Sequence, residues 1–514
     1  MSLLWIIPLA VVFSAAHVAG KNDPISPTSW GPYYCNIRQA ARWAAENESE
    51  VVPMADFLKK FIGDRAFYKR VLYLALPVVI QNGITNLASL LDNMMVGRIG
   101  TEPMSGVAIA NQLIFVFNVT IFGAMSGPGI FGAQYAGRRD VKGFRDIFRM
   151  KLLLAGIISL LGLGICGFFG EQLLSLYLSD SDSPAARAAT LEAAMTYLRW
   201  IMPGMPLFAL AQSYTSSLRE WGETIVPMRA GITAVLVNLC FNWLLIFGHL
   251  GFPELGVAGA AIATTISRVV ELVIVMLTAH RSLERFPFVI ELYKSFKLPG
   301  KLLGDVVRKG SPLLANEFLW SMGKSSITQA YSYRGLTVIA AMNICSTVAN
   351  LFNIFYMSIG TAVAILLGQT LGTGDMEKAR DTCRKLLALS TTVGVCVGAL
   401  VSVVAPLVAN MYNTEMAVKA LATDFLRLTA LAMPLFAFSH ASYFTMRSGG
   451  KTGITFIFDC GYTVAIELPL AMFLCRFTGL DVWLVYFLVQ QSNWIKVAMG
   501  GYLIKKGVWL KQIV

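Results

Sequence analysis

Long apolar stretches separated by short polar connections dominate the chain from about residue 72 to its end. A transmembrane helix needs about 20 predominantly apolar residues, and twelve stretches reach that length. Glycine and proline inside them, as in Gly127-Pro128-Gly129, are tolerated in bundled membrane helices. The pattern predicts an all-α polytopic membrane protein with twelve transmembrane helices, near residues 72–96, 104–135, 152–178, 191–213, 228–247, 255–280, 313–333, 340–371, 386–411, 417–443, 454–474 and 482–504.

The chain contains two copies of one unit. Residues from Pro77 onward align with residues from Pro312 onward at a constant offset of 235, without gaps, for about a hundred positions. After residues 177 and 412 the offset becomes 228. Each copy holds six of the predicted helices, and internal repeats of this kind are typical of membrane transporters. The matching segments include Gln134-x-x-Gly137 with Gln369-x-x-Gly372, MPLFA at 205 and 433, and Arg219-x-x-Gly222 with Arg447-x-x-Gly450.

Composition and charge agree with this class. The chain is 56% hydrophobic and only 14% charged, whereas soluble proteins carry about 25% charged residues. The net charge of +12 is unevenly placed: the connections on one side hold twenty-one Lys and Arg, and those on the other side hold at most five. By the positive-inside rule, both ends of the twelve-helix unit lie in the cytoplasm. The basic charge therefore indicates topology, and no nucleic-acid partner is expected.

Residues 1–53 fit this pattern poorly. The first twenty residues have the apolar stretch of a signal peptide but no basic segment before it, and residues 21–53 are polar. We expect that translation starts at Met54; the alternatives are a thirteenth helix or a processed leader. The remaining chain divides into an N-lobe with helices 1–6 (54–280), a cytoplasmic connection (281–308) and a C-lobe with helices 7–12 (309–514).

Four polar residues of the first copy fall at similar depth in the outer half of the membrane. Asp92 lies near the outer end of the first helix, and Asn238 and Asn242 lie four residues apart on one face of the fifth. Thr264 lies about nine residues from the outer start of the sixth helix. Carboxylate, amide and hydroxyl oxygens suit a hard cation such as Na⁺, and a proton could use the same carboxylate. The alternative is a solvated Asp92 and an Asn pair that only joins helices.

The second copy does not repeat this set, because the position of the aspartate is taken by Ile327. It carries its own acids at membrane depth, and such groups are functional candidates because they are costly to bury. Glu317 and Asp459 are candidates for a substrate or proton site, whereas the role of Glu467 stays open. The alternative for these acids is pairing with a base inside the bundle, such as Lys324.

From about residue 65 to its end, the chain resembles the multidrug and toxic compound extrusion (MATE) transporters. No single motif decides this, but the ordered set covers some 450 residues. The resemblance implies two six-helix lobes around a central cleft, related by an axis along the membrane normal. An even number of helices per repeat gives both copies the same orientation, so the repeats are parallel. The motifs are LPVVIQNGITNLASLLDNMMVGRIGT, GAQYAGRRD, NLCFNW, GVAGAAIAT, LLANEFLWSMG and MRSGGKT.

The resemblance also implies a function. Members export cationic or amphipathic drugs and toxic metabolites across the plasma (inner) membrane in exchange for Na⁺ or H⁺, by alternating access. The first-lobe cation site of the family falls on Asp92, Asn238, Asn242 and Thr264, and its helix 7 acid falls on Glu317. Some sodium-coupled members use a further Asp in helix 10; here that helix has only Asp424, near its outer start, so a second-lobe Na⁺ site is not expected. We expect a monomer, no cofactor, and no metal beyond Na⁺ at the coupling site.

Other functions are less well supported. A flippase for lipid-linked sugars, or a polysaccharide-type exporter of the same broad superfamily, lines its cavity with Arg, whereas the buried charges here are mainly acids. A membrane enzyme would need a motif such as H-E-x-x-H or a Ser/His pair, which the sequence lacks. The protein is therefore predicted not to be an enzyme. The sequence does not name the substrate or decide between Na⁺ and H⁺.

Overall fold

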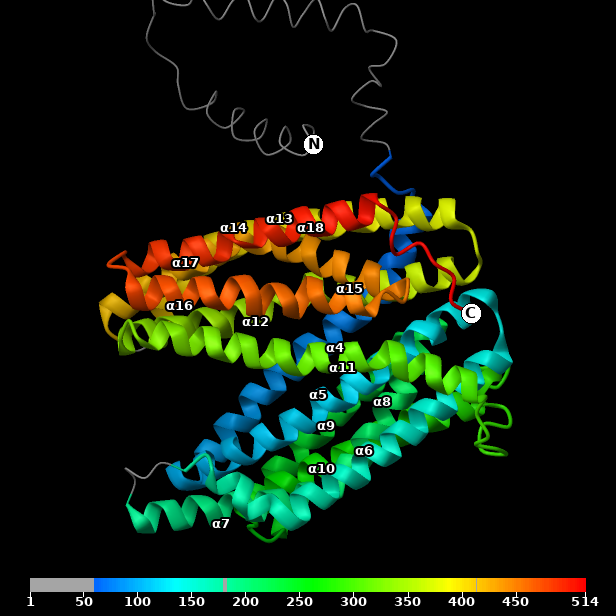
Figure 1. The fold of residues 1–514 in the computed structure, drawn as a ribbon. Helices are drawn as coiled ribbons and strands as arrows, with labels where there is room; N and C mark the ends of the chain where they lie inside the picture. The colour runs from blue at the N-terminus through cyan, green and yellow to red at the C-terminus, as the bar shows by residue number, and fades with distance from the viewer. Residues whose placement is uncertain (1–59, 179–182, 413) are drawn as a thin grey trace, which may run out of the picture. The chain divides into compact units, whose positions relative to one another are not determined.

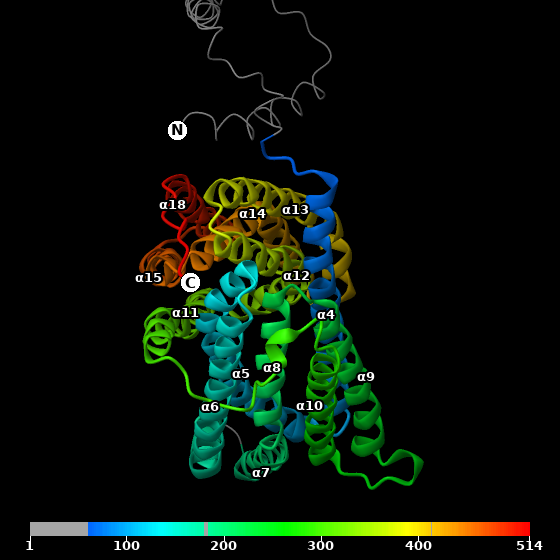
Figure 2. The same ribbon diagram turned by 90° about the vertical axis from the view of Figure 1, so that its right-hand side faces the viewer.

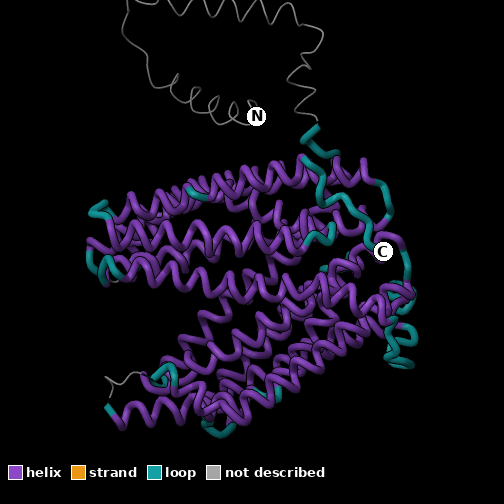
Figure 3. Tube along the Cα trace, in the orientation of Figure 1, coloured by secondary structure: helices purple, strands orange, loops and turns teal. Residues whose placement is uncertain are grey.

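Helices make up almost all of the computed structural model, which describes residues 60–178, 183–412 and 414–514 (Figures 1 and 3). The predicted extension 1–53 and the hypothesis of a start at Met54 lie outside these residues. Residues 60–514 form one compact unit. All twelve predicted helices are found within the described residues, and nine meet length and composition criteria for crossing a membrane.

The first copy provides six of the twelve, and its fourth helix is broken into two pieces. The break falls at Met202 and Pro203, where a proline takes the position before the first residue of the second piece. The elements are α4 (Arg65–Gly97), α5 (Thr101–Arg138), α6 (Val141–Ser175), α7 (Pro184–Ile201), α8 (Gly204–Trp221), α9 (Ile225–Phe247) and α10 (Gly256–Arg281), with short 3₁₀ turns η1 (His249–Gly251) and η2 (Pro287–Val289).

In the second copy the eleventh helix contains two π-helical segments, and the twelfth is interrupted at Ser492. The elements are α11 (Gly300–Ser332), α12 (Leu336–Gly372), α13 (Met376–Met411), α14 (Met416–Ser448), α15 (Thr452–Phe456), η3 (Ile457–Gly461), η4 (Thr463–Glu467), α16 (Leu468–Phe477), α17 (Val482–Gln491) and α18 (Asn493–Lys505). Because π-helical turns are often found at functional sites, η3 and η4 are of interest for the acids that they carry.

The repeat is visible in how helices begin. The Asp140 side chain accepts a hydrogen bond of 2.9 Å from the Gly143 N–H at the start of α6, and Asp375 accepts one of 2.9 Å from the Lys378 N–H at the start of α13. The two aspartates are related by the offset of 235. Such side-chain caps satisfy N–H groups that the helix itself leaves free, so both repeats end the same connection in the same way.

The helices form two bundles, α4–α10 and α11–α18 (Figures 1 and 2). The first has its own apolar clusters, including Leu174, Leu198 and Ile246, and the second has a large one around Phe425 and Val485. These bundles are the predicted N-lobe and C-lobe, with one exception. The beginning of α4, at residues 71–75, packs into a C-lobe cluster on α12 and α13, so α4 starts on one lobe and ends in the other.

The lobes meet at one end of the molecule, which we call the basic end. It holds the connections α5–α6, α8–α9, α10–α11, α12–α13 and α14–α15. The twenty-one Lys and Arg counted above lie in these connections and in the adjoining parts of the helices. There α5 lies against α11 so closely that a β-carbon on Gly127 would be 2.6 Å from the Cα of Gly310. Toward the opposite end, Val116 on α5, Met357 on α12 and Phe318 on α11 are exposed. The lobes thus touch at the basic end and diverge from it (Figure 1).

Candidate functional site

The structure brings the four predicted cation-site residues together. The amide of Asn242 donates a hydrogen bond to Oδ1 of Asp92. With its amide nitrogen turned toward the carboxylate, Asn238 donates to the two oxygens of Asp92 at 3.0 and 3.2 Å, and its own oxygen accepts from the Thr264 hydroxyl at 3.2 Å. Asn238 and Asn242 are buried, and Asp92 is partly buried. The four groups on α4, α9 and α10 are therefore neighbours in the structure, and their role as a cation site stays a prediction.

The oxygens of this cluster fit a small cation. The side-chain oxygen of Asn242 is buried and accepts no hydrogen bond from the described residues, so one acceptor is left without a partner beside a carboxylate. A buried acceptor without a donor is unfavourable unless something else satisfies it. The buried Tyr197 of α7 lies close to Thr264 and to Asn111 of α5. Sequence reasoning missed Tyr197 and Asn111, because helix depth does not tell which neighbouring helices face the site.

The three C-lobe acids have different surroundings. Asp459 on η3 forms an ion pair with Lys496 at 2.5 Å and accepts a bond of 3.0 Å from the Asn316 amide. Glu467 on η4 pairs with Lys324 at 2.6 Å. Lys324, which was named above as a base that could pair with these acids, therefore pairs with Glu467. Pairing within the bundle, the alternative considered for these acids, describes Asp459 and Glu467, and a substrate or proton role for Asp459 stays a prediction.

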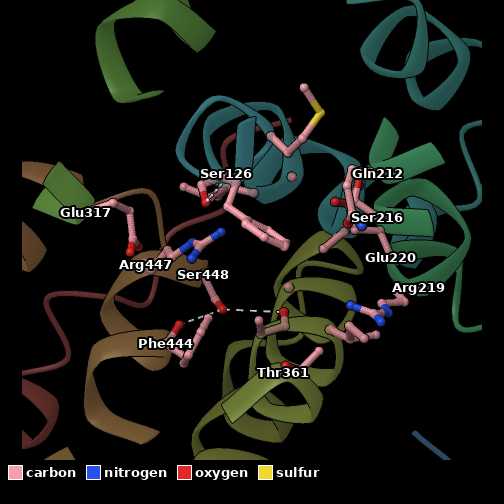
Figure 4. A pocket seen from close by; sticks show the side chains of 18 residues that line it. Ser126, Gln212, Ser216, Arg219, Glu220, Glu317, Thr361, Phe444, Arg447 and Ser448 are labelled. Atoms are coloured by element: carbon pink, nitrogen blue, oxygen red, sulfur yellow. Dashed lines mark hydrogen bonds between the residues drawn. The ribbon is translucent and has the colours of Figure 1, made fainter. Parts of the chain in front are cut away.

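Glu317 instead lines a cavity of about 360 Å³ that lies between the two lobes (Figure 4). The Tyr443 hydroxyl donates a hydrogen bond of 3.4 Å to Oε1 of Glu317. The volume is in the range of sites that hold small molecules. The charged and amide side chains on its wall are Gln212, Arg219, Glu220, Glu317 and Arg447.

Two of these wall residues correct an expectation from the sequence. Arg219 lies in the last turn of α8 and Arg447 in the last turn of α14, and the offset of 228 makes them equivalent in the two repeats. We counted both among the cytoplasmic connections, but both line the cavity. Glu220 is neutralised by the buried Lys151, whose ammonium lies 2.6 and 2.7 Å from its two oxygens. The charges left on the wall are one acid and two arginines, so the buried charges here are not mainly acids.

The cavity is closed at the basic end by a pair of equivalent contacts. The Gln134 amide on α5 donates to the Ser448 carbonyl of the C-lobe at 3.0 Å, and the Gln369 amide on α12 donates to the Glu220 carbonyl of the N-lobe at 2.9 Å. The C-terminal segment adds to the first of these contacts, because the N–H of Ile513 donates to the side-chain oxygen of Gln134 at 2.8 Å. In each lobe, an equivalent glutamine thus donates its side-chain amide to a backbone carbonyl of the other lobe.

The duplicated twelve-helix fold, the intramembrane polar cluster and the cavity between the lobes define a membrane transporter. A family model described as MatE matches the chain twice, over residues 77–244 and 312–473. The chain belongs to the MatE family, which confirms the resemblance noted in the sequence, and the protein is a transporter and not an enzyme. The two matched segments begin at Pro77 and Pro312, the positions where the internal repeat begins.

Curated proteins and a solved structure agree with this assignment. The chain is 23% identical to the "Probable multidrug resistance protein YoeA" of Bacillus subtilis, over 80% of this chain and 88% of that protein. It is 26% identical to the multidrug resistance protein PmpM of Pseudomonas aeruginosa, over 82% and 85%. A solved structure described as the outward-facing conformation of a multidrug resistance MATE family transporter of the MOP superfamily superposes with a TM-score of 0.76 at 20% identity, over 87% and 98%. That likeness supports the fold.

Proposed function

We propose that the protein is a secondary active exporter. It moves cationic or amphipathic small molecules, such as drugs and toxic metabolites, out of the cell in exchange for Na⁺ or H⁺. The observation that carries this proposal is the cluster of Asp92 with Asn238, Asn242 and Thr264, because an ionisable group at membrane depth is costly and marks ion pathways. The printed names of the relatives, which are multidrug resistance proteins, support a small-molecule cargo.

We further propose that the basic end faces the cytoplasm and that the protein works as a monomer in the plasma (inner) membrane. The uneven Lys and Arg distribution supports this orientation. In it, the structure is closed toward the cytoplasm by Gln134 and Gln369 and its lobes diverge toward the outside. Alternating access then requires a second arrangement in which the contacts at the basic end are broken.

Coupling uses the charge of Asp92. One cation moving inward across the membrane potential supplies about 2.3 kcal/mol per 100 mV. In the outward-open arrangement Asp92 takes the cation from outside, with the two Asn side chains and Thr264 supplying neutral oxygens. In the inward-open arrangement the cation leaves toward the cytoplasm. Cargo bound in the cavity near Glu317 moves the opposite way, and the fixed negative charge of Glu317 favours cationic cargo.

The lipid-linked sugar flippase, or polysaccharide-type exporter, stays as the alternative, and one observation favours it. Arg219 and Arg447 both line the cavity, and guanidinium groups bind phosphates and carboxylates well. The two functions differ in the charge of the cargo, so competition between cargoes separates them. A cationic dye that is displaced by other cations, and not by anionic sugar phosphates, supports drug export.

The test uses inverted membrane vesicles, in which the cytoplasmic face is outside. A cationic fluorescent dye should accumulate inside when a sodium gradient or a proton gradient is imposed, each in the absence of the other. Asp92→Asn should abolish this accumulation. The matched control is Asp424→Asn, because Asp424 lies exposed near the start of α14 and away from the cluster. Failure of both gradients to drive any accumulation in the unsubstituted protein would refute cation-coupled export.

A further inference from the structure

A positive residue lies beside the candidate cation site. Arg268 follows Thr264 by four residues on α10, so the two share a face of the helix. Thr264 is hydrogen-bonded to Asn238, which in turn donates to Asp92, so Arg268 lies about one helical turn from the cluster and within electrostatic range of its carboxylate. The Arg268 side chain is about one-third exposed (33%). The carboxylate of the site therefore has a positive charge of the protein's own in its vicinity.

Arg268 has a second acid within reach. Its Nη1 lies 2.8 Å from Oε2 of Glu271, three residues further along α10, and the Glu271 side chain is buried. The plane of the Phe208 ring supports the guanidinium, with 5.0 Å between the guanidinium carbon and the ring centre. Arg268 is thus in direct contact with Glu271 in this structure and within electrostatic range of Asp92.

The C-lobe contains a pair of a base and an intramembrane acid that are in direct contact. Lys496 Nζ on α18 is 2.5 Å from Oδ1 of Asp459, and it also lies over the rings of Phe458 and Tyr462 at 5.3 and 5.5 Å. Among the described residues, Asp459 is the acid with which Lys496 forms an ion pair.

We propose that Arg268 is a tethered counter-ion of the coupling site, which balances Asp92 when the coupling cation has left and moves fully to Glu271 when the cation is bound. This inference rests on the proposed function. It explains how Asp92 can release a cation without leaving a buried charge uncompensated, which would be costly.

We expect that replacing Arg268 and replacing Glu271 change the affinity for the coupling cation in opposite directions. A positive charge near Asp92 competes with the coupling cation, because unit charges a few Å apart interact by several kcal/mol even at an effective dielectric constant of about 20. Arg268→Gln should therefore lower the cation concentration for half-maximal transport, by roughly tenfold if about 1.4 kcal/mol of competition is lost. It should also lower the maximal rate, because the cation leaves more slowly. Glu271→Gln should raise the half-saturating concentration, because Arg268 then has only Asp92 as partner.

The experiment uses the full chain reconstituted in liposomes, with efflux of a cationic dye followed against Na⁺ concentration at fixed pH and against pH without Na⁺. The concentration that gives half-maximal transport is then determined for the ion that drives transport, Na⁺ or H⁺. Arg268→Lys, which keeps the charge, should stay within about threefold of the unsubstituted protein. Radioactive Na⁺ binding, or proton uptake on mixing, is then compared for Arg268→Gln in the Asp92→Asn background, where Arg268 should have no effect.

The counter-ion proposal is supported if the half-saturating cation concentration shifts in opposite directions for Arg268→Gln and Glu271→Gln. An unchanged half-saturating concentration in both variants, or shifts in the same direction, overturns it and leaves Arg268 as a packing residue. If Arg268→Gln does not insert, the shift in Glu271→Gln alone decides in the same way. The proposed function fails by a separate result: Asp92→Asn that still pumps at the unsubstituted rate.

Discussion

Gly137 and Gly372 occupy equivalent positions in the two repeats, and each lies against the backbone of the other repeat. A β-carbon on Gly137 would lie 1.9 Å from the carbonyl oxygen of Gln369, and one on Gly372 would lie 2.0 Å from the carbonyl oxygen of Gln134. Neither distance is compatible with any side chain, since the opposing atom is backbone. The closed basic end therefore depends on two positions that must carry glycine.

Gly137→Ala should weaken closure of the basic end, because the added methyl group forces α5 and α12 apart. The prediction is that a thiol introduced in the cavity, Ser216→Cys, reacts several-fold faster with a membrane-impermeant reagent added from the basic side. The control is Gly156→Ala on α6, where nothing lies within 4 Å of the new β-carbon. Equal reaction rates in the two variants would contradict a gate at this contact.

Asp92→Asn should abolish coupled export while the protein still folds and inserts, since Asn keeps the shape of the side chain but cannot carry its negative charge. Asn238→Ala, Asn242→Ala and Thr264→Ala should give graded losses, because each removes one neutral oxygen from the cluster. Gradient-driven dye transport measures both effects. Near-normal pumping by Asp92→Asn would move attention to Glu317 as the coupling acid.

Glu317→Gln should reduce export of cationic compounds more than export of neutral ones, because it removes the negative charge from a cavity wall that also carries Arg219 and Arg447. The measurement is the ratio of transport rates for a cationic dye and a neutral analogue. The exposed Glu377 on α13 offers a matched control, Glu377→Gln. An equal fall for both compounds would point to a structural or coupling role.

The Lys151–Glu220 pair should be important for stability. The Lys151 side chain is fully buried, and its ammonium contacts both Glu220 oxygens together with the Ser216 hydroxyl at 3.1 Å. Removing one partner leaves the other charge buried alone, which costs about 3–5 kcal/mol. Glu220→Gln or Lys151→Met should therefore lower the melting temperature in detergent clearly, and the double variant should recover part of the loss. Additive losses would argue against a direct pair.

Topology can be tested with thiols placed at the two ends. A cysteine replacing Thr414, in the connection between α13 and α14, should react with an impermeant reagent outside intact cells. One replacing Lys294, whose side chain is 72% exposed in the connection between α10 and α11, should react only after the membrane is opened. The protein without either substitution corrects for its natural cysteines. The reverse pattern would invert the proposed orientation.

The depth of each polar residue in the membrane could be predicted from the sequence. Which helices lie next to one another could not. Asp92, Asn238 and Thr264 were placed together because the apolar stretches fix where each helix enters the membrane and the rise per residue is constant. The acid that pairs with Lys324 could not be assigned from the sequence, because Glu467 reaches it from another helix, 143 positions away along the chain. Hydrophobic spacing does not record which helices are neighbours.

Helix ends were the second difficulty. Arg219 and Arg447 follow apolar stretches and were therefore counted with the basic connections, but α8 and α14 continue past them and bring both to the cavity. The shared R-x-x-G-x-T pattern in the two repeats was a signal that their position matters. The π-helical turns at Asp459 and Glu467 left no comparable trace, since they depend on how α11 and α18 pack against that helix.

No ion pair among the described residues joins the N-lobe to the C-lobe: each lies within one lobe, within the connection after α10, or between that connection and the N-lobe. The contacts that close the basic end, by contrast, use amides, carbonyls and glycines. Each half can therefore neutralise its intramembrane charges while the ribosome is still producing the rest of the chain. Assembly of the two halves then requires no charge to find its counterpart across the boundary, so two fragments divided in the connection after α10 and produced together should associate into a working transporter.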